Sequence, residues 1–132
     1  MPPNTKPSTP REAYKAIIDQ LVEEARVGVS QQLVRESGIY SKAKGYTEAN
    51  ELVRSMTTEQ RRVLSDVLLD QRLSAIAGAL SILTWWISCH GVALTYRGEP
   101  MPMELTEEGL HGDFIGRCNG WEWLDQSGPA AV

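Results

Sequence analysis

Apolar side chains recur every three or four residues through the first third of the chain. Thr9, Pro10 and Glu12 have the spacing of a capping box with proline at the first helical position. Because the apolar positions that follow share one face, we predict an amphipathic helix from Thr9 that passes a weak point at Gly28 and stops near Gly38. These positions are Tyr14, Ile17, Ile18, Leu21, Val22, Ala25, Val29, Leu33 and Val34.

Two more helix starts follow a connecting loop over residues 37–46. A short helix is predicted over Thr47–Met56, and Thr57 and Gln60 form a second capping box for a longer helix. The apolar pattern then changes phase near Asp70. We therefore predict a kink or a break there, with Asp70 capping a new helix.

The helix predicted from Leu73 to His90 is apolar on all sides. One stripe has alternating three- and four-residue spacing, and the opposite side is apolar too; the stripe is Leu73, Ile76, Leu80, Leu83 and Ile87, and the opposite side is Ala75, Ala79, Ile82 and Trp86. A helix of this kind must be covered on all sides. We predict that it forms the buried centre of the fold, covered by other helices of the chain or in part by a second copy.

The same region is also long enough to cross a membrane. Residues 73–96 contain no Asp, Glu, Lys or Arg. However, serines, glycines, Thr84 and His90 interrupt it, and its mean hydropathy of roughly 1.3 lies below that of confident membrane spans. The sequence therefore favours a core helix, and no membrane partner is predicted.

The helical spacing of apolar residues ends at Gly91. The segments "VALTY", "RGEP" and "MPMEL" predict one short hairpin, and "FIGR" and "WEWL" around "CNG" predict another. The four glycines from Gly109 to Gly120 would cost a helix about 4 kcal/mol relative to alanines, so we predict mostly loop there. The predicted fold class is mainly α: a small helical bundle of about four helices around a buried central helix, with a C-terminal tail that forms one or two short β-hairpins.

Length and charge limit the functional classes. With 132 residues we predict one helical domain over residues 9–125, of which 91–125 wrap the core, and flexible ends at 1–8 and 126–132. The net charge is −4, with ten basic and eight acidic residues over 1–62 against three and nine over 63–132. This balance argues against a duplex nucleic-acid partner. A start without an apolar segment and two cysteines outside a Cys-x-x-Cys spacing predict a cytoplasmic protein.

The stretch "GLHGDFIGRCNGWEW" holds most of the candidate chemistry. A His-x-Asp pair suits a transition metal, and His90 could complete it if the tail folds back onto the end of the central helix. An arginine four residues after the aspartate could lock this loop or receive an anion. The candidate ligand-binding residues are His90, His111, Asp113, Arg117, Trp121 and Trp123.

No complete catalytic motif supports an enzyme. The chain has no Gly-x-Ser-x-Gly elbow, phosphate loop or dinucleotide fingerprint, so no catalytic residue, metal or cofactor is predicted. We predict a small interaction protein that forms a homodimer or binds an unknown protein partner. Two alternatives stay open: an enzyme or metal-dependent binder with its site between the central helix and the tail, and an inhibitor-type protein that presents its acidic half to a basic target.

Overall fold

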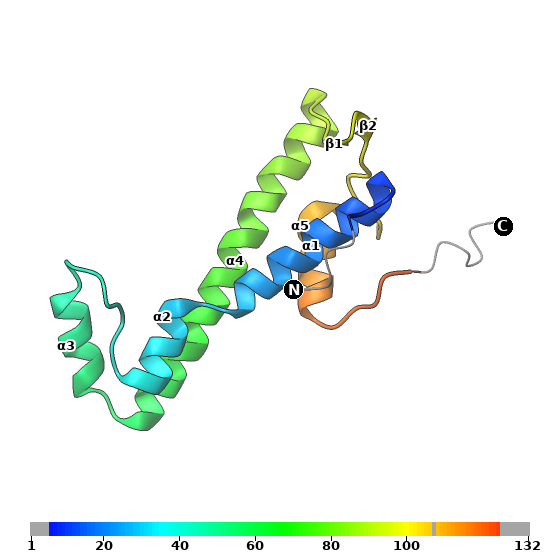
Figure 1. Ribbon diagram of the computed structural model, residues 1–132. Coiled ribbons are helices and arrows are strands. Elements are labelled where there is room, and N and C mark those ends of the chain that lie inside the picture. Colours follow the sequence, from blue (N-terminus) through cyan, green and yellow to red (C-terminus); the bar gives the residue numbers. More distant parts are fainter. Residues whose placement is uncertain (1–5, 107, 125–132) are drawn as a thin grey trace. The chain divides into compact units, whose positions relative to one another are not determined.

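The computed structural model describes residues 6–106 and 108–124, and this part of the chain is mainly helical, as predicted (Figure 1). The predicted flexible end at 126–132 and residues 1–5 of the predicted arm lie outside the described residues. The elements are α1 (Pro10–Arg26), α2 (Val29–Gln32), a short π-helix (Leu33–Ser37), α3 (Thr47–Ser55), α4 (Thr58–His90), β1 (Thr95–Tyr96), β2 (Glu99–Pro100) and α5 (Gly109–Cys118).

The chain forms two compact units. One contains the described residues up to Val22 and from Ala77 onward, and the other is Glu23–Ile76. Both α1 and α4 contribute residues to each unit. We refer to them as the terminal unit and the middle unit.

Buried valines and the hydrogen bonds of the Asn50 side chain organise the middle unit. Val34 and Val53 are buried. The Asn50 side chain accepts hydrogen bonds from the Tyr40 and Ser41 amides at 2.8 and 3.0 Å, which ties the loop after the π-helix to α3. The predicted weak point is a real break, because α1 ends at Arg26 and α2 begins after Gly28. Gly38, in a left-handed conformation at φ 67°, ends the π-helix where the sequence predicted a stop.

The second capping box is confirmed. The Gln60 amide donates to Thr57 Oγ1 at 3.1 Å, and the Thr57 amide donates to Gln60 Oε1 at 2.9 Å. We expect Thr57→Ala to lower the free energy of unfolding by about 1 kcal/mol, because two amides at the start of α4 lose a partner or its alignment. Chemical denaturation measures this. Thr58→Ala, one residue on, is the control, and an equal loss in both variants would contradict a capping role.

The predicted break near Asp70 is wrong, because α4 is one continuous helix. Neither glycine nor proline interrupts its backbone between residues 58 and 77. The change of phase moves the packed face around the helix without breaking it. Arg72 instead fastens α4 to the end of α1, where its Nε donates to the Glu24 carbonyl at 3.1 Å.

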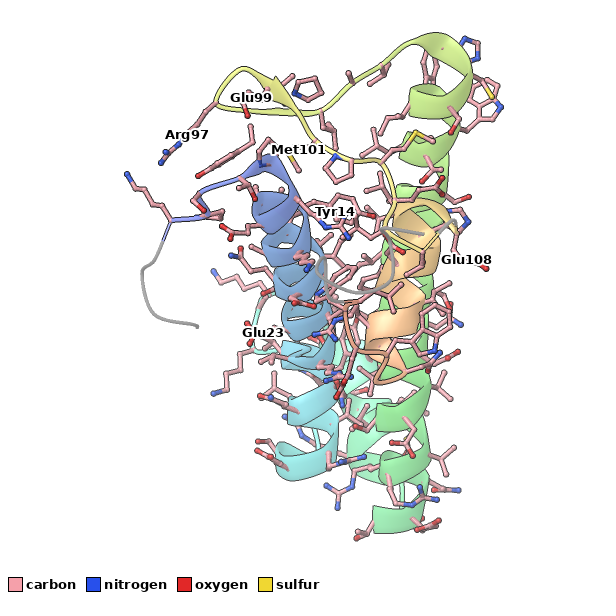
Figure 2. All side chains as sticks on the ribbon, turned by 90° about the vertical axis from the view of Figure 1, so that its right-hand side faces the viewer. Tyr14, Glu23, Arg97, Glu99, Met101 and Glu108 are labelled. Atoms are coloured by element: carbon pink, nitrogen blue, oxygen red, sulfur yellow. The ribbon has the colours of Figure 1, made fainter. Side chains whose placement is uncertain are left out.

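In the terminal unit, α5 contacts both α1 and α4. The Leu110 amide donates to Thr84 Oγ1 at 3.1 Å, and Tyr14 of α1 donates to Asp113 of α5. The buried apolar side chains of this unit come from α1 and α5: Ala13, Tyr14, Ile18, Val22, Leu110 and Phe114. Figure 2 shows α5 beside α1 and α4, with the hairpin extending from the end of α4 towards the start of α1.

One predicted hairpin is present and the other is wrong. Thr95 pairs with Pro100 and Tyr96 with Glu99 in an antiparallel ladder. Residues 109–118, predicted as loop and hairpin, form α5, because burial of Leu110 and Phe114 offsets the poor helix propensity of the glycines. Packing also requires glycine in α5, since a Cβ would lie 2.1 Å from Glu108 Cβ at Gly112 and 2.2 Å from Trp121 Cε3 at Gly116.

The prediction that the rest of the chain buries the helix from Leu73 to His90 on all sides is also wrong. Ser65 is the one buried residue of α4, all of which is described. The predicted stripe of Leu73, Ile76, Leu80, Leu83 and Ile87 is half-buried, so it does face the rest of the chain. The opposite side is uncovered, with Ile82 64% and Trp86 46% exposed. By length and composition α4 could cross a membrane, since its most apolar window has a mean hydropathy of 1.4.

Candidate functional site

The six predicted site residues lie in the terminal unit but do not form one cluster. His111, Asp113 and Arg117 lie on α5, Trp121 and Trp123 follow it, and His90 ends α4. Two places in the terminal unit could therefore serve as a site. One is the junction of α5 with α1, and the other is the exposed side of α4.

Asp113 is the buried polar centre of the junction. It is 1% exposed and accepts hydrogen bonds from the Tyr14 hydroxyl, the Leu105 amide at 2.8 Å and the Thr106 hydroxyl. Burial, and then the hydrogen bond to this carboxylate, raises the pKa of Tyr14 well above its usual range. Since both oxygens of Asp113 are engaged, the carboxylate joins three segments of the chain and holds them in place.

Arg117 pairs with Asp19 rather than with Asp113. Its Nε donates to Asp19 Oδ1 at 2.7 Å, and the Trp123 indole donates to the other oxygen, Asp19 Oδ2, at 2.9 Å. Arg117 also donates to the Trp121 carbonyl. Its guanidinium lies 5.2 Å from the centre of the Trp123 ring. Arg117 therefore forms an ion pair, as predicted for a structural role, but its partner is Asp19, so the pair holds the segment after α5 against α1.

The two histidines have different surroundings. The His90 ring lies 4.3 Å from that of Trp85 and 4.7 Å from that of Trp86. His111 Nδ1 is buried and has no hydrogen-bond partner. The described residues contain no group of three or more His, Cys, Asp or Glu positioned to hold a metal. The metal-dependent alternative thus gains no support from this part of the chain.

The exposed side of α4 carries a continuous apolar seam, which we define as Gly78, Ile82, Trp85, Trp86 and Cys89. Four of these positions follow at intervals of four, three and four residues, so they share one face. The Trp85 and Trp86 rings meet edge to face at 5.6 Å between centres. All five residues are exposed. Nothing lies within 4 Å of a Cβ built at Gly78.

Sequence reasoning found part of this seam. It placed Ile82 and Trp86 on the second apolar side but missed Trp85, which is 53% exposed. The signal that could have found Trp85 is the spacing that it shares with Gly78, Ile82 and Cys89. The described residues of the terminal unit do not cover this side of α4.

Comparison with known proteins identifies a family, but no activity is known for it. The model of a family of unknown function (DUF6547) matches residues 7–125. No curated protein and no solved structure matches the chain.

Proposed function

The chain belongs to the DUF6547 family, whose function is unknown, and we propose that it is a small non-enzymatic interaction protein that pairs with a second copy of itself. The observation that carries this proposal is the seam on α4. An exposed, continuous apolar face on a helix is typical of an interaction site. Its spacing is the one by which two helices pack side by side.

The absence of charge favours a second copy as the occupant. In a two-fold interface each patch faces the same patch of its partner, so a charged patch would repel itself. No Asp, Glu, Lys or Arg occurs between Leu73 and Tyr96. The seam can therefore meet its own copy without burying an unpaired ion.

The sizes of the side chains are also suited to self-pairing. Ile82 lies at the middle of the seam, with Gly78 and Ala79 on one side of it and Trp85 and Trp86 on the other. An antiparallel pair with its two-fold axis at Ile82 places the small residues of each copy opposite the tryptophans of the other. Small residues opposite large ones allow two helices to interdigitate closely.

A membrane is the other occupant to consider, because α4 passes the test of length and composition. Electrostatics favours the protein partner. Residues 63–132 carry three basic and nine acidic residues, and anionic lipid surfaces attract basic segments and not acidic ones. As part of the proposal we place the homodimer in the cytoplasm, where the free thiols of Cys89 and Cys118 stay reduced.

The dimer is tested with two substitutions of equal charge. We expect Ile82→Asp to raise the dissociation constant at least tenfold, because it would bury an unpaired carboxylate at the centre of the interface. Leu52→Asp is the matched control, since it also replaces an exposed aliphatic residue by aspartate, at a 59% exposed position of α3 outside the seam. Sedimentation equilibrium at micromolar concentrations measures the constants, and thermal unfolding shows whether both variants fold.

Two results would contradict the proposal. One is a wild-type protein that stays monomeric across the concentration range. The other is co-sedimentation of the wild type with vesicles of neutral and anionic lipids, lost in Ile82→Asp and retained in Leu52→Asp. That result would assign the seam to a membrane instead.

A further inference from the structure

Helix α5 is too short and too rich in glycine to be stable by itself. It has ten residues, and Gly109, Gly112 and Gly116 are three of them. Isolated helices shorter than about 12–15 residues are marginal in water even when alanine dominates their sequence, and glycine is among the poorest helix formers. The stability of α5 must therefore come from its contacts with the rest of the terminal unit.

Two of these glycines lie where other side chains come very close. A Cβ at Gly109 would lie 2.8 Å from Thr84 Cγ2 of α4, and a Cβ at Gly116 would lie 2.2 Å from Trp121 Cε3. Alanine at position 116 would strengthen an isolated helix but would collide with Trp121 in the docked one. These positions therefore suit the docked helix and leave it weak when it is not docked.

One carboxylate of α1 fastens both α5 and the residues that follow it. Asp19 Oδ1 accepts a hydrogen bond from Arg117 Nε at 2.7 Å, and Asp19 Oδ2 accepts one from the Trp123 indole at 2.9 Å. The Asp19 side chain is 40% exposed, so water competes for both bonds. Because the two contacts share this acceptor, α5 and the segment after it are released together when the acceptor is lost.

Tyr14 of α1 is covered by the same two segments. Its hydroxyl donates to Asp113 of α5, and its ring meets the Trp123 ring edge to face at 6.2 Å between centres. Tyr14 is 1% exposed while these contacts are in place. Release of α5 and Trp123 would remove both contacts and open this part of α1 to solvent.

We propose that α5 and residues 119–124 form a clasp, which detaches from α1 and α4 as one unit and unfolds while those two helices stay folded. Elements with few stabilising contacts open locally at a lower free energy than the whole protein. The closed clasp buries Tyr14 and the open clasp exposes it, so the clasp controls access to this part of α1. Its contacts involve only residues of the terminal unit outside the seam, so the clasp is independent of the proposed dimer.

Amide hydrogen exchange of the full wild-type chain, followed by NMR near neutral pH, is the first test. After correction for the intrinsic rate of each amide, we expect residues 113–118 of α5 to exchange at least 100-fold faster than residues 14–22 of α1. The reason is that the α5 amides become accessible whenever the clasp opens, whereas the α1 amides need a larger unfolding event. One common rate for both sets would overturn the proposal, because α5 would then open only when the whole unit unfolds.

The second test removes the shared acceptor. We expect Asp19→Ala to speed exchange of residues 113–118 at least tenfold, because two hydrogen bonds to a carboxylate are lost, and to leave residues 62–70 of α4 unchanged. Glu23→Ala is the matched control, since it removes an exposed carboxylate one turn further along α1, at a residue labelled in Figure 2. It should change neither rate. An equal acceleration in the two variants, or one that extends to residues 62–70, would contradict a clasp fastened by Asp19.

Discussion

Asp113→Ala is expected to lower the free energy of unfolding by about 3–5 kcal/mol. The reason is the set of donors that the substitution leaves behind. Asp113 is 1% exposed and accepts hydrogen bonds from Tyr14, Leu105 and Thr106. Without the carboxylate, the buried Tyr14 hydroxyl and the Leu105 amide each lose a partner, and each loss costs about 1–3 kcal/mol.

Two comparisons make this prediction specific. Asp113→Asn keeps an acceptor oxygen and the side-chain volume, so it should cost less than the alanine substitution. Asp66→Ala removes a carboxylate that forms exposed salt bridges with Arg35 and Arg62, and should cost about 1 kcal/mol or less. Chemical denaturation of the three variants measures the differences. If Asp113→Ala and Asp66→Ala cost the same, Asp113 does not organise the junction.

The elements that the sequence predicted well are those specified by neighbouring residues. The capping box of Thr57 and Gln60, the stop at Gly38 and the end of α4 before Gly91 each depend on side chains a few positions apart. The same holds for the hairpin, where Arg97 and Gly98 connect two strands of two residues each. Local chemistry determines such features, so a single sequence is enough to find them.

Helix α5 and its junction depend on contacts that no local pattern shows. The propensity of its glycines predicts a loop, but packing of Phe114 and the hydrogen bonds of Asp113 outweigh that preference. Tyr14 lies 99 positions from Asp113, and Asp19 lies 98 positions from Arg117. The sequence could name Asp113 and Arg117 as polar residues of interest, but it could not give their partners.

Periodicity also cannot say what covers an apolar face. It correctly assigned Leu80 and Leu83 to the packed side of α4 and Ile82 to the opposite side. It left open whether the chain itself or a second copy covers the other side. An apolar face that a second molecule covers has the same sequence pattern as one buried within the chain. The seam therefore became visible only with the exposure of each side chain in hand.

Above pH 10 the protein is expected to lose stability through Tyr14. Burial and the Asp113 hydrogen bond raise the pKa of Tyr14 in the folded state above its ordinary value of 10.0. The stability due to this raised pKa is complete below that ordinary value and falls as the pH rises above it, because the unfolded chain then loses a proton that the folded chain keeps. The slope is about 1.4 kcal/mol per pH unit, which gives a loss of about 2 kcal/mol by about pH 11.5.

Tyr14→Phe isolates this contribution from the lysines and other tyrosines that titrate in the same range. At neutral pH the variant should be less stable than the wild type by about 1 kcal/mol, because the hydrogen bond to Asp113 is missing. With no hydroxyl to titrate, its stability should fall less steeply above pH 10, so the two curves converge and then cross. Urea denaturation from neutral pH to about pH 11.5 measures both curves. Parallel curves would mean that Tyr14 keeps an ordinary pKa and that the junction is open to water.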